Sequence, residues 1–105
     1  MIRVEYVDGR ACPLVRCDGC GEQITDAGMA GVVWPLNAGP EFPQYGEGPT
    51  IPRFLCKTNR CLSRCDWPWE ELSTWLVFLV GNVGLDGATR WRDAQGHAEF
   101  ARRCR

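Results

Sequence analysis

Hydrophobic and polar residues alternate at the start of the chain. The segment IRVEYV predicts a β-strand with Ile2, Val4 and Tyr6 on one face. The Asp-Gly pair that follows is typical of a two-residue hairpin turn. The return strand, ACPLVR, is expected to lie at a sheet edge or to be broken at Pro13, because proline has no backbone N–H to donate.

Two further apolar runs predict strands in the middle of the chain. They are AGVVWPL, ending near Pro35, and RFLC at residues 53–56. Between them, residues 37–52 are rich in glycine and proline and show no periodicity. A loop of this length in a small domain is usually functional or mobile.

The pattern becomes helical after residue 66. Apolar residues recur at helical spacing at Trp69, Leu72, Leu76 and Leu79. This stripe predicts a helix from about residue 67 to 80, capped by Asp66 and packed on the strands. The tail DAQGHAEFARRCR predicts a second, short helix. The fold class is therefore α+β, with a β part followed by one main helix and a short C-terminal helix.

The length of 105 residues predicts a single domain, residues 1–105. A chain this small with 12 glycines and 7 prolines has little stability to spare, so a covalent or metal staple is expected. The odd number of cysteines, 7, would leave a spare thiol in any disulfide framework. The first residues do not form a signal-peptide pattern, and the apolar run WLVFLV is far shorter than a membrane span. We therefore expect a metal staple and a reducing, cytoplasmic location.

Two cysteine clusters have the spacing of a thiolate metal site. The first, CDGCG, holds Cys17 and Cys20 on a tight turn, and the second, CKTNRC, holds Cys56 and Cys61. An apolar pair or triplet leads into each cluster, so we predict these four as the ligands of one Zn²⁺ ion. In the second turn, Asn59 is expected to take the strained backbone conformation.

Cys65 is the rival for the fourth ligand. It follows Cys61 by four residues, so both could face a metal from one helical turn, and it would then replace Cys56. A small buried apolar residue is the other interpretation of Cys65. Cys12 and Cys104 are predicted not to be ligands.

The two cysteine pairs, with strands before each and a helix after the second, resemble the zinc-ribbon and treble-clef zinc domains over residues 14–80. This resemblance implies one structural zinc, held by four ligands on two hairpin turns or on a turn and a helix start. The spacing CxxxxC in the second pair departs from the commoner CxxC.

The net charge of the chain and the placement of its basic residues limit the kinds of partner it can bind. The net charge is −1, and four zinc-bound thiolates would bring it to about −3, which is not the balance of a protein held to DNA by its phosphates. The sequence RFLCKTNRCLSR nevertheless has a basic run, which consists of Arg53, Lys57, Arg60 and Arg64. We predict a binding module with a protein partner, and the alternative is a nucleic-acid contact through this basic run. The sequence does not indicate an oligomeric state.

An enzyme is not expected. His97 and Glu99 match the H-x-E element of zinc deaminases, but those enzymes need a PCxxC motif downstream, and only six residues follow Glu99. A catalytic cysteine with His97 as base has no identifiable group to orient the imidazole. A solvated helix position is the better interpretation of this histidine.

Overall fold

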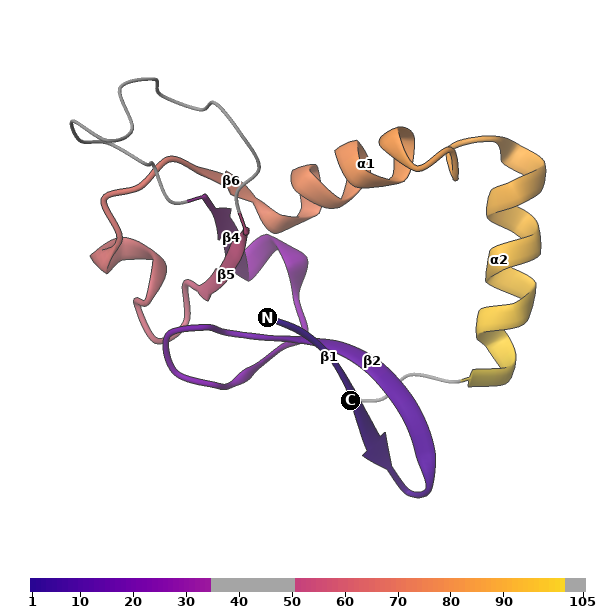
Figure 1. Ribbon diagram of the computed structural model, residues 1–105, viewed down its shortest axis with the longest axis horizontal. Helices are drawn as coiled ribbons and strands as arrows, with labels where there is room; N and C mark the ends of the chain where they lie inside the picture. Colours follow the sequence, from indigo (N-terminus) through magenta and orange to yellow (C-terminus); the bar gives the residue numbers. More distant parts are fainter. Residues whose placement is uncertain (35–50, 102–105) are drawn as a thin grey trace.

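The computed structural model describes residues 1–34 and 51–101 and has an α+β fold (Figure 1). Two three-stranded antiparallel sheets carry the first part of the chain, and two helices follow. The first sheet has the order β1-β2-β3, with β1 at Ile2–Val7, β2 at Arg10–Arg16 and β3 at Gln23–Ile24. The expected α+β class is confirmed.

The first two strands form the predicted hairpin. Asp8 and Gly9 have φ angles of 50° and 77°, and a type I′ turn needs positive φ at both positions. Strand β2 is not broken at Pro13, which lies opposite Val4. The short strand β3 pairs only with Val15 and Arg16, so Pro13 has no strand on its other side among the described residues. A missing N–H is tolerated there.

The second sheet holds the centre of the core. Its order is β5-β4-β6, with β4 at Ala30–Val33, β5 at Arg53–Cys56 and β6 at Trp69–Glu71. All four residues of β4 are buried. Short 3₁₀ helices lie before β4, at Ala27–Met29, and after β5, at Leu62–Arg64.

The first helix begins later than the sequence predicts. Helix α1 spans Leu72–Asn82, and the predicted cap Asp66 lies six residues before it. Residues 69–71 instead form β6, because the exposed edge of β4 offers them a backbone ladder, and such tertiary pairing overrides helix propensity. Helix α2 spans Ala88–Ala101 and is the longer of the two helices.

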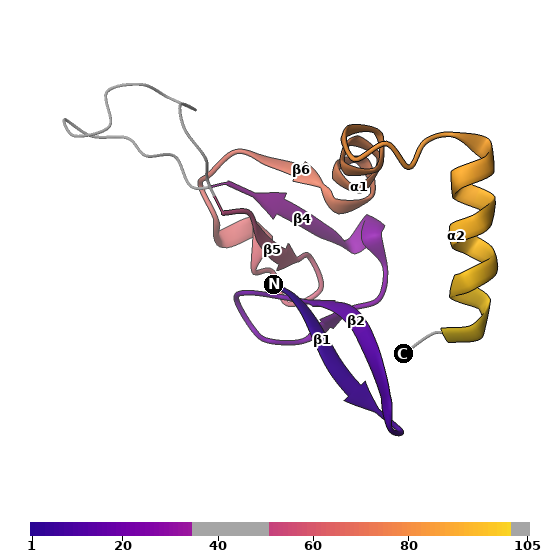
Figure 2. The same ribbon diagram turned by 45° about the vertical axis from the view of Figure 1, so that its right-hand side comes forward.

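Only part of the apolar stripe enters the core. Leu72 is buried with Ala30, Val32 and Phe54, and Leu76 packs partly against this cluster. Trp69 and Leu79 are exposed, so the expectation that the whole stripe packs on the strands is wrong. The arrangement of the helices gives the reason: α1 runs away from the sheets after its first turns (Figure 1), and α2 stands away from both sheets (Figure 2).

Some predicted features cannot be placed. The predicted loop 37–52 lies, except for its last two residues, outside the described residues, and so does Cys104. Within the described part of the chain, neither helix has the length and apolar character needed to cross a membrane.

Candidate metal centre

The first cysteine pair lies on a tight turn between β2 and β3. The turn is closed by a 2.9 Å hydrogen bond from the Gly21 backbone N–H to the Cys17 carbonyl. Gly21 has a φ of 80°, a conformation that glycine adopts without strain. Asp18 ties the turn to β5, because its backbone N–H donates to the Phe54 carbonyl and its carboxylate accepts from the Phe54 N–H, at 2.7 and 2.8 Å.

The second pair spans the end of β5 and the start of the following 3₁₀ helix. Cys56 is the last residue of β5, and Cys61 immediately precedes the 3₁₀ helix. The prediction that Asn59 takes the strained backbone is wrong: Arg60 has the positive φ, 60°. The Asn59 side chain is needed elsewhere, since its amide Nδ2 donates to Cys20 Sγ at 3.3 Å.

The two turns bring the four predicted cysteines together. The Sγ atoms of Cys17, Cys20, Cys56 and Cys61 all lie within 4.8 Å of one another. The sulfurs of Cys20 and Cys56 are 3.7 Å apart. Four thiolates at tetrahedral zinc distances of about 2.3 Å have sulfurs about 3.8 Å apart. The four cysteines are therefore positioned to bind one metal ion, and their all-sulfur chemistry fits zinc.

A glycine makes this convergence possible. A Cβ atom on Gly19 would lie 2.9 Å from the Cys61 sulfur, which is closer than real Cβ contacts allow. A side chain at position 19 would therefore push the second cysteine turn away from the first. The sequence shows the glycine but does not show that Cys61 is its neighbour.

Hydrogen bonds to sulfur favour the thiolate form that a metal needs. The backbone N–H groups of Gly19 and Cys56 each donate to Cys17 Sγ at 3.3 Å. Donors that hydrogen-bond to a ligand sulfur in this way orient it toward a metal and stabilise its charge. The Asn59 amide plays the same part for Cys20, and sequence reasoning missed this role.

The thiols of the cluster have divergent acidities. The Asn59 hydrogen bond is the largest cause that lowers the pKa of Cys20, to about 6. Burial raises the pKa of Cys61 to about 12, and it also raises the pKa of Cys56. Cys20 thus ionises before Cys56 and Cys61, and binding of a dication would release the protons of those two thiols.

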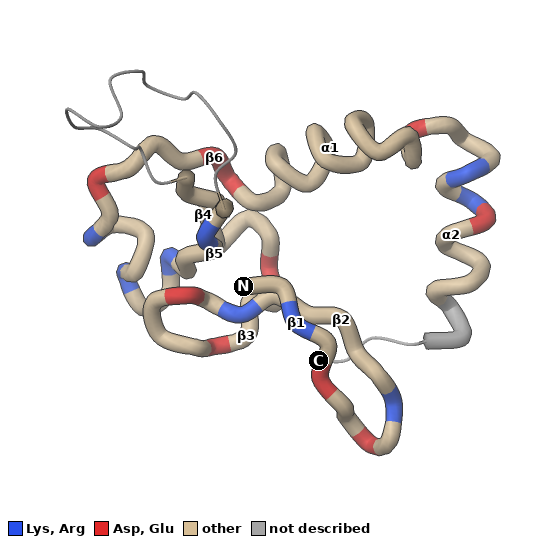
Figure 3. The backbone as a smooth tube through the Cα atoms, viewed as in Figure 1, with Lys and Arg blue, Asp and Glu red and all other residues tan. Residues whose placement is uncertain are grey.

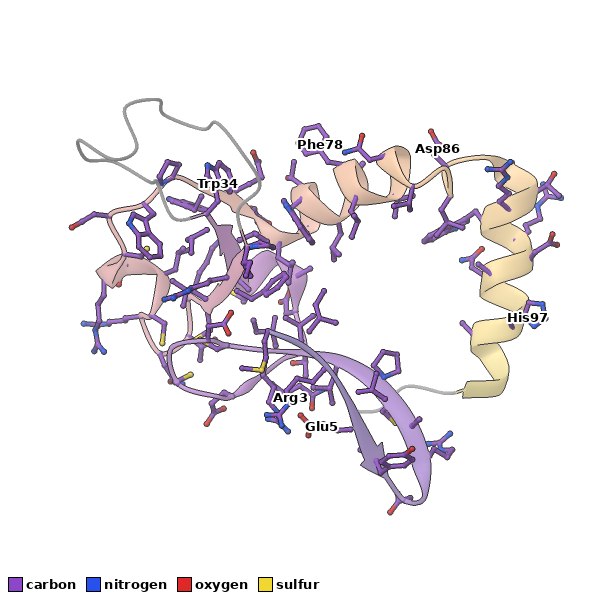
Figure 4. All side chains as sticks on the ribbon, viewed as in Figure 1. Arg3, Glu5, Trp34, Phe78, Asp86 and His97 are labelled. Atoms are coloured by element: carbon purple, nitrogen blue, oxygen red, sulfur yellow. The ribbon has the colours of Figure 1, made fainter. Side chains whose placement is uncertain are left out.

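The remaining candidates lie apart from this group. Cys65 is a free thiol packed against the neighbouring core, outside the set of converging sulfurs. Cys12 is disulfide-bonded and is not available to a metal. His97 lies on the exposed side of α2, far from both cysteine turns (Figure 4). Among the described residues, no second group of this kind converges.

Comparisons with protein-family models, with curated proteins and with solved structures give no match. The case for a metal site therefore rests on the geometry of this chain alone. The resemblance to zinc ribbons stays a prediction, while the convergence of four cysteines on one point is a feature of the fold.

Proposed function

We propose that the protein is a non-enzymatic zinc-binding module that acts through a protein partner in the cytoplasm. The four converging cysteines carry the first part of this proposal. Four thiolates fill the tetrahedral shell of zinc and leave no position for water or substrate, so the ion has a structural role. In a reducing cytoplasm the bond at Cys12 would be open, and the four thiols of the cluster would be available to zinc.

The surface of α1 supports a protein partner. No charged residue lies between Leu72 and Asn82, so the helix is tan, without blue or red, along its length in Figure 3. Val77 and Phe78 are 70% and 60% exposed, and Figure 4 shows Phe78 pointing away from the sheets. Exposed apolar groups gathered on one helix are typical of a surface that packs into the groove of another protein.

We infer the chemistry of the partner from a hollow beside this helix. It has a volume of about 350 Å³ and lies where α1, the following turn and α2 meet. Its lining consists of Leu76, Val77, Val80, Leu85, Asp86 and Trp91. Asp86 is the one charged group of this lining. A partner segment with an apolar anchor next to a basic residue matches both features.

The partner proposal predicts the effect of a charge on α1. The zinc-loaded wild-type protein should retain a specific partner from its own cytoplasm after nuclease treatment. Phe78→Asp should lower the amount of partner recovered at least about tenfold, because it places a charge in an apolar interface. Affinity capture followed by quantitative mass spectrometry measures this. Gln95→Asp is the matched control, since it places the same charge at an exposed position of α2. Equal recovery with Phe78→Asp, at unchanged zinc content, would remove α1 as the partner surface.

Nucleic acid is the second candidate, and one feature favours it. A hollow of about 640 Å³ beside the second cysteine turn is lined in part by Lys57, Arg60 and Trp69. However, Lys57 Nζ already lies over the Trp69 ring, 5.7 Å from its centroid, and Arg53 lies 5.4 Å from the Trp67 centroid. A base that stacked on the Trp69 or Trp67 ring would compete with these cations or contact them as well.

We expect the affinity for single- or double-stranded oligonucleotides to be no tighter than about micromolar at physiological salt, because the net charge is −1 and the basic run has only four cations. The affinity should fall as salt rises, because each phosphate contact releases a counterion. Fluorescence anisotropy with labelled oligonucleotides measures it. The double variant Arg60→Ala/Arg64→Ala is the informative comparison. Nanomolar binding that this variant loses would make nucleic acid, rather than protein, the partner.

A further inference from the structure

Strand β1 leaves one edge of the first sheet open. It pairs with β2 alone among the described residues, and Figure 1 shows the hairpin projecting from the rest of the molecule. Met1 and Arg16 exchange both backbone hydrogen bonds. Hydrogen-bonded pairs alternate along an antiparallel ladder, so the backbone groups of Ile2, Val4 and Tyr6 point away from β2, toward the open edge.

The side chains of these three residues are also without cover. Ile2, Val4 and Tyr6 are 58%, 64% and 80% exposed and lie on one face of the hairpin. Edge strands of soluble proteins are usually protected by proline, by charged side chains, especially lysine, or by a bulge. Strand β1 has no proline, lysine or bulge, and its two charged residues, Arg3 and Glu5, are of opposite sign, so they do not exclude a second antiparallel copy.

We infer that β1 pairs antiparallel with β1 of a second copy of the chain, about a two-fold axis at Val4, and joins the two hairpins into one sheet. In this register Val4 faces Val4 of the second copy, and Ile2 faces the second copy's Tyr6. The outward backbone groups of both strands then meet at hydrogen-bonded positions. The apolar side chains form cross-strand pairs on one face. The contact is isologous, as in most homodimers.

The charges of β1 select this register. With the axis at Val4, Arg3 of each copy lies opposite Glu5 of the other. A shift of the axis to either neighbouring residue would place Arg3 opposite Arg3 or Glu5 opposite Glu5, and like charges directly opposite destabilise a sheet. Within one chain, Arg3 Nε already lies 3.7 Å from Glu5 Oε2, and both residues are labelled in Figure 4.

Arg16 keeps Glu5 in its ionised form for this pairing. Its guanidinium donates to both carboxylate oxygens of Glu5, at 2.5 and 2.8 Å, and this contact lowers the pKa of Glu5. A glutamate is already ionised at neutral pH, and this contact extends its ionised range to lower pH. A second copy is favoured over an unrelated strand because it supplies the complementary charge and the complementary apolar residue at the same time.

The oligomeric state of the zinc-loaded full chain tests the inference. Two short strands bury a small area, so a dimer with a dissociation constant on the order of tens of micromolar is expected in sedimentation equilibrium. Val4→Pro should raise this constant at least about tenfold, because it removes the outward N–H at the axis without removing a bond to β2. Val4→Thr keeps that N–H and is the matched control.

A charge exchange tests the register. Arg3→Glu alone should also weaken the dimer, and mixing it with Glu5→Arg should give a heterodimer, in which every facing pair is again of opposite sign. Circular dichroism and zinc content establish that each variant is folded. A chain that is monomeric at all concentrations, or a dimer that withstands Val4→Pro, would overturn the inference. A dimer lost with Phe78→Asp but kept with Val4→Pro would place the contact on α1 instead.

Discussion

Replacing Cys17 by serine is expected to abolish zinc binding and the cooperative unfolding transition of the chain. Cys17 is buried, and its sulfur accepts two backbone N–H groups, so its loss removes a ligand and the connection between the two cysteine turns. Structural zinc supplies about 10–16 kcal/mol of folding free energy. The free energy of unfolding of a small domain is only about 5–15 kcal/mol. Elemental analysis for zinc and thermal unfolding followed by circular dichroism measure both effects.

The comparison of Cys56→Ser with Cys65→Ser completes this test. We expect about one zinc per chain in the wild type and in Cys65→Ser, and none in Cys56→Ser, because the Cys56 sulfur lies in the converging group and that of Cys65 does not. Zinc retained by Cys17→Ser would contradict the metal centre. If only Cys65→Ser lost its zinc, the fourth ligand would be Cys65 and not Cys56.

The strands near the metal centre were predictable because local and tertiary preferences agree there. The alternation in IRVEYV and the Asp-Gly turn both favour the hairpin, and the structure has it at the expected residues. The apolar runs around Val32 and Phe54 likewise became buried neighbouring strands. In β4 and β5, the apolar residues that form the strand also form the core, whereas β1 follows from its alternation and its turn without entering the core.

The start of α1 was not predictable in the same way. The residues before Leu72 have a helical apolar spacing, yet they pair with β4 as a third strand. This pairing depends on where β4 ends and on Gly31, where a Cβ would lie 2.7 Å from a Leu62 methyl group. Such a contact between distant residues leaves no local pattern in the sequence.

The cysteine turns show the same limit on a smaller scale. The spacing of the pairs predicted which four sulfurs converge. It did not show which residue would take the positive φ, or that the Asn59 amide would reach a sulfur 39 positions earlier in the chain. The choice of converging cysteines follows from local spacing, whereas the hydrogen bonds around their sulfurs depend on how the two turns face each other.

Replacing Leu72 by alanine is expected to lower the free energy of unfolding of the zinc form by about 2–5 kcal/mol, because the side chain is 2% exposed in the core and its loss leaves a cavity. Leu79→Ala is the matched control on the same helix. Leu79 is exposed at 37%, so its removal should cost less than about 1 kcal/mol. Urea unfolding with excess zinc, followed by tryptophan fluorescence, measures both variants. Equal costs would mean that the outer face of α1 is buried in the protein alone, and the apolar surface proposed for the partner would then not be available to it.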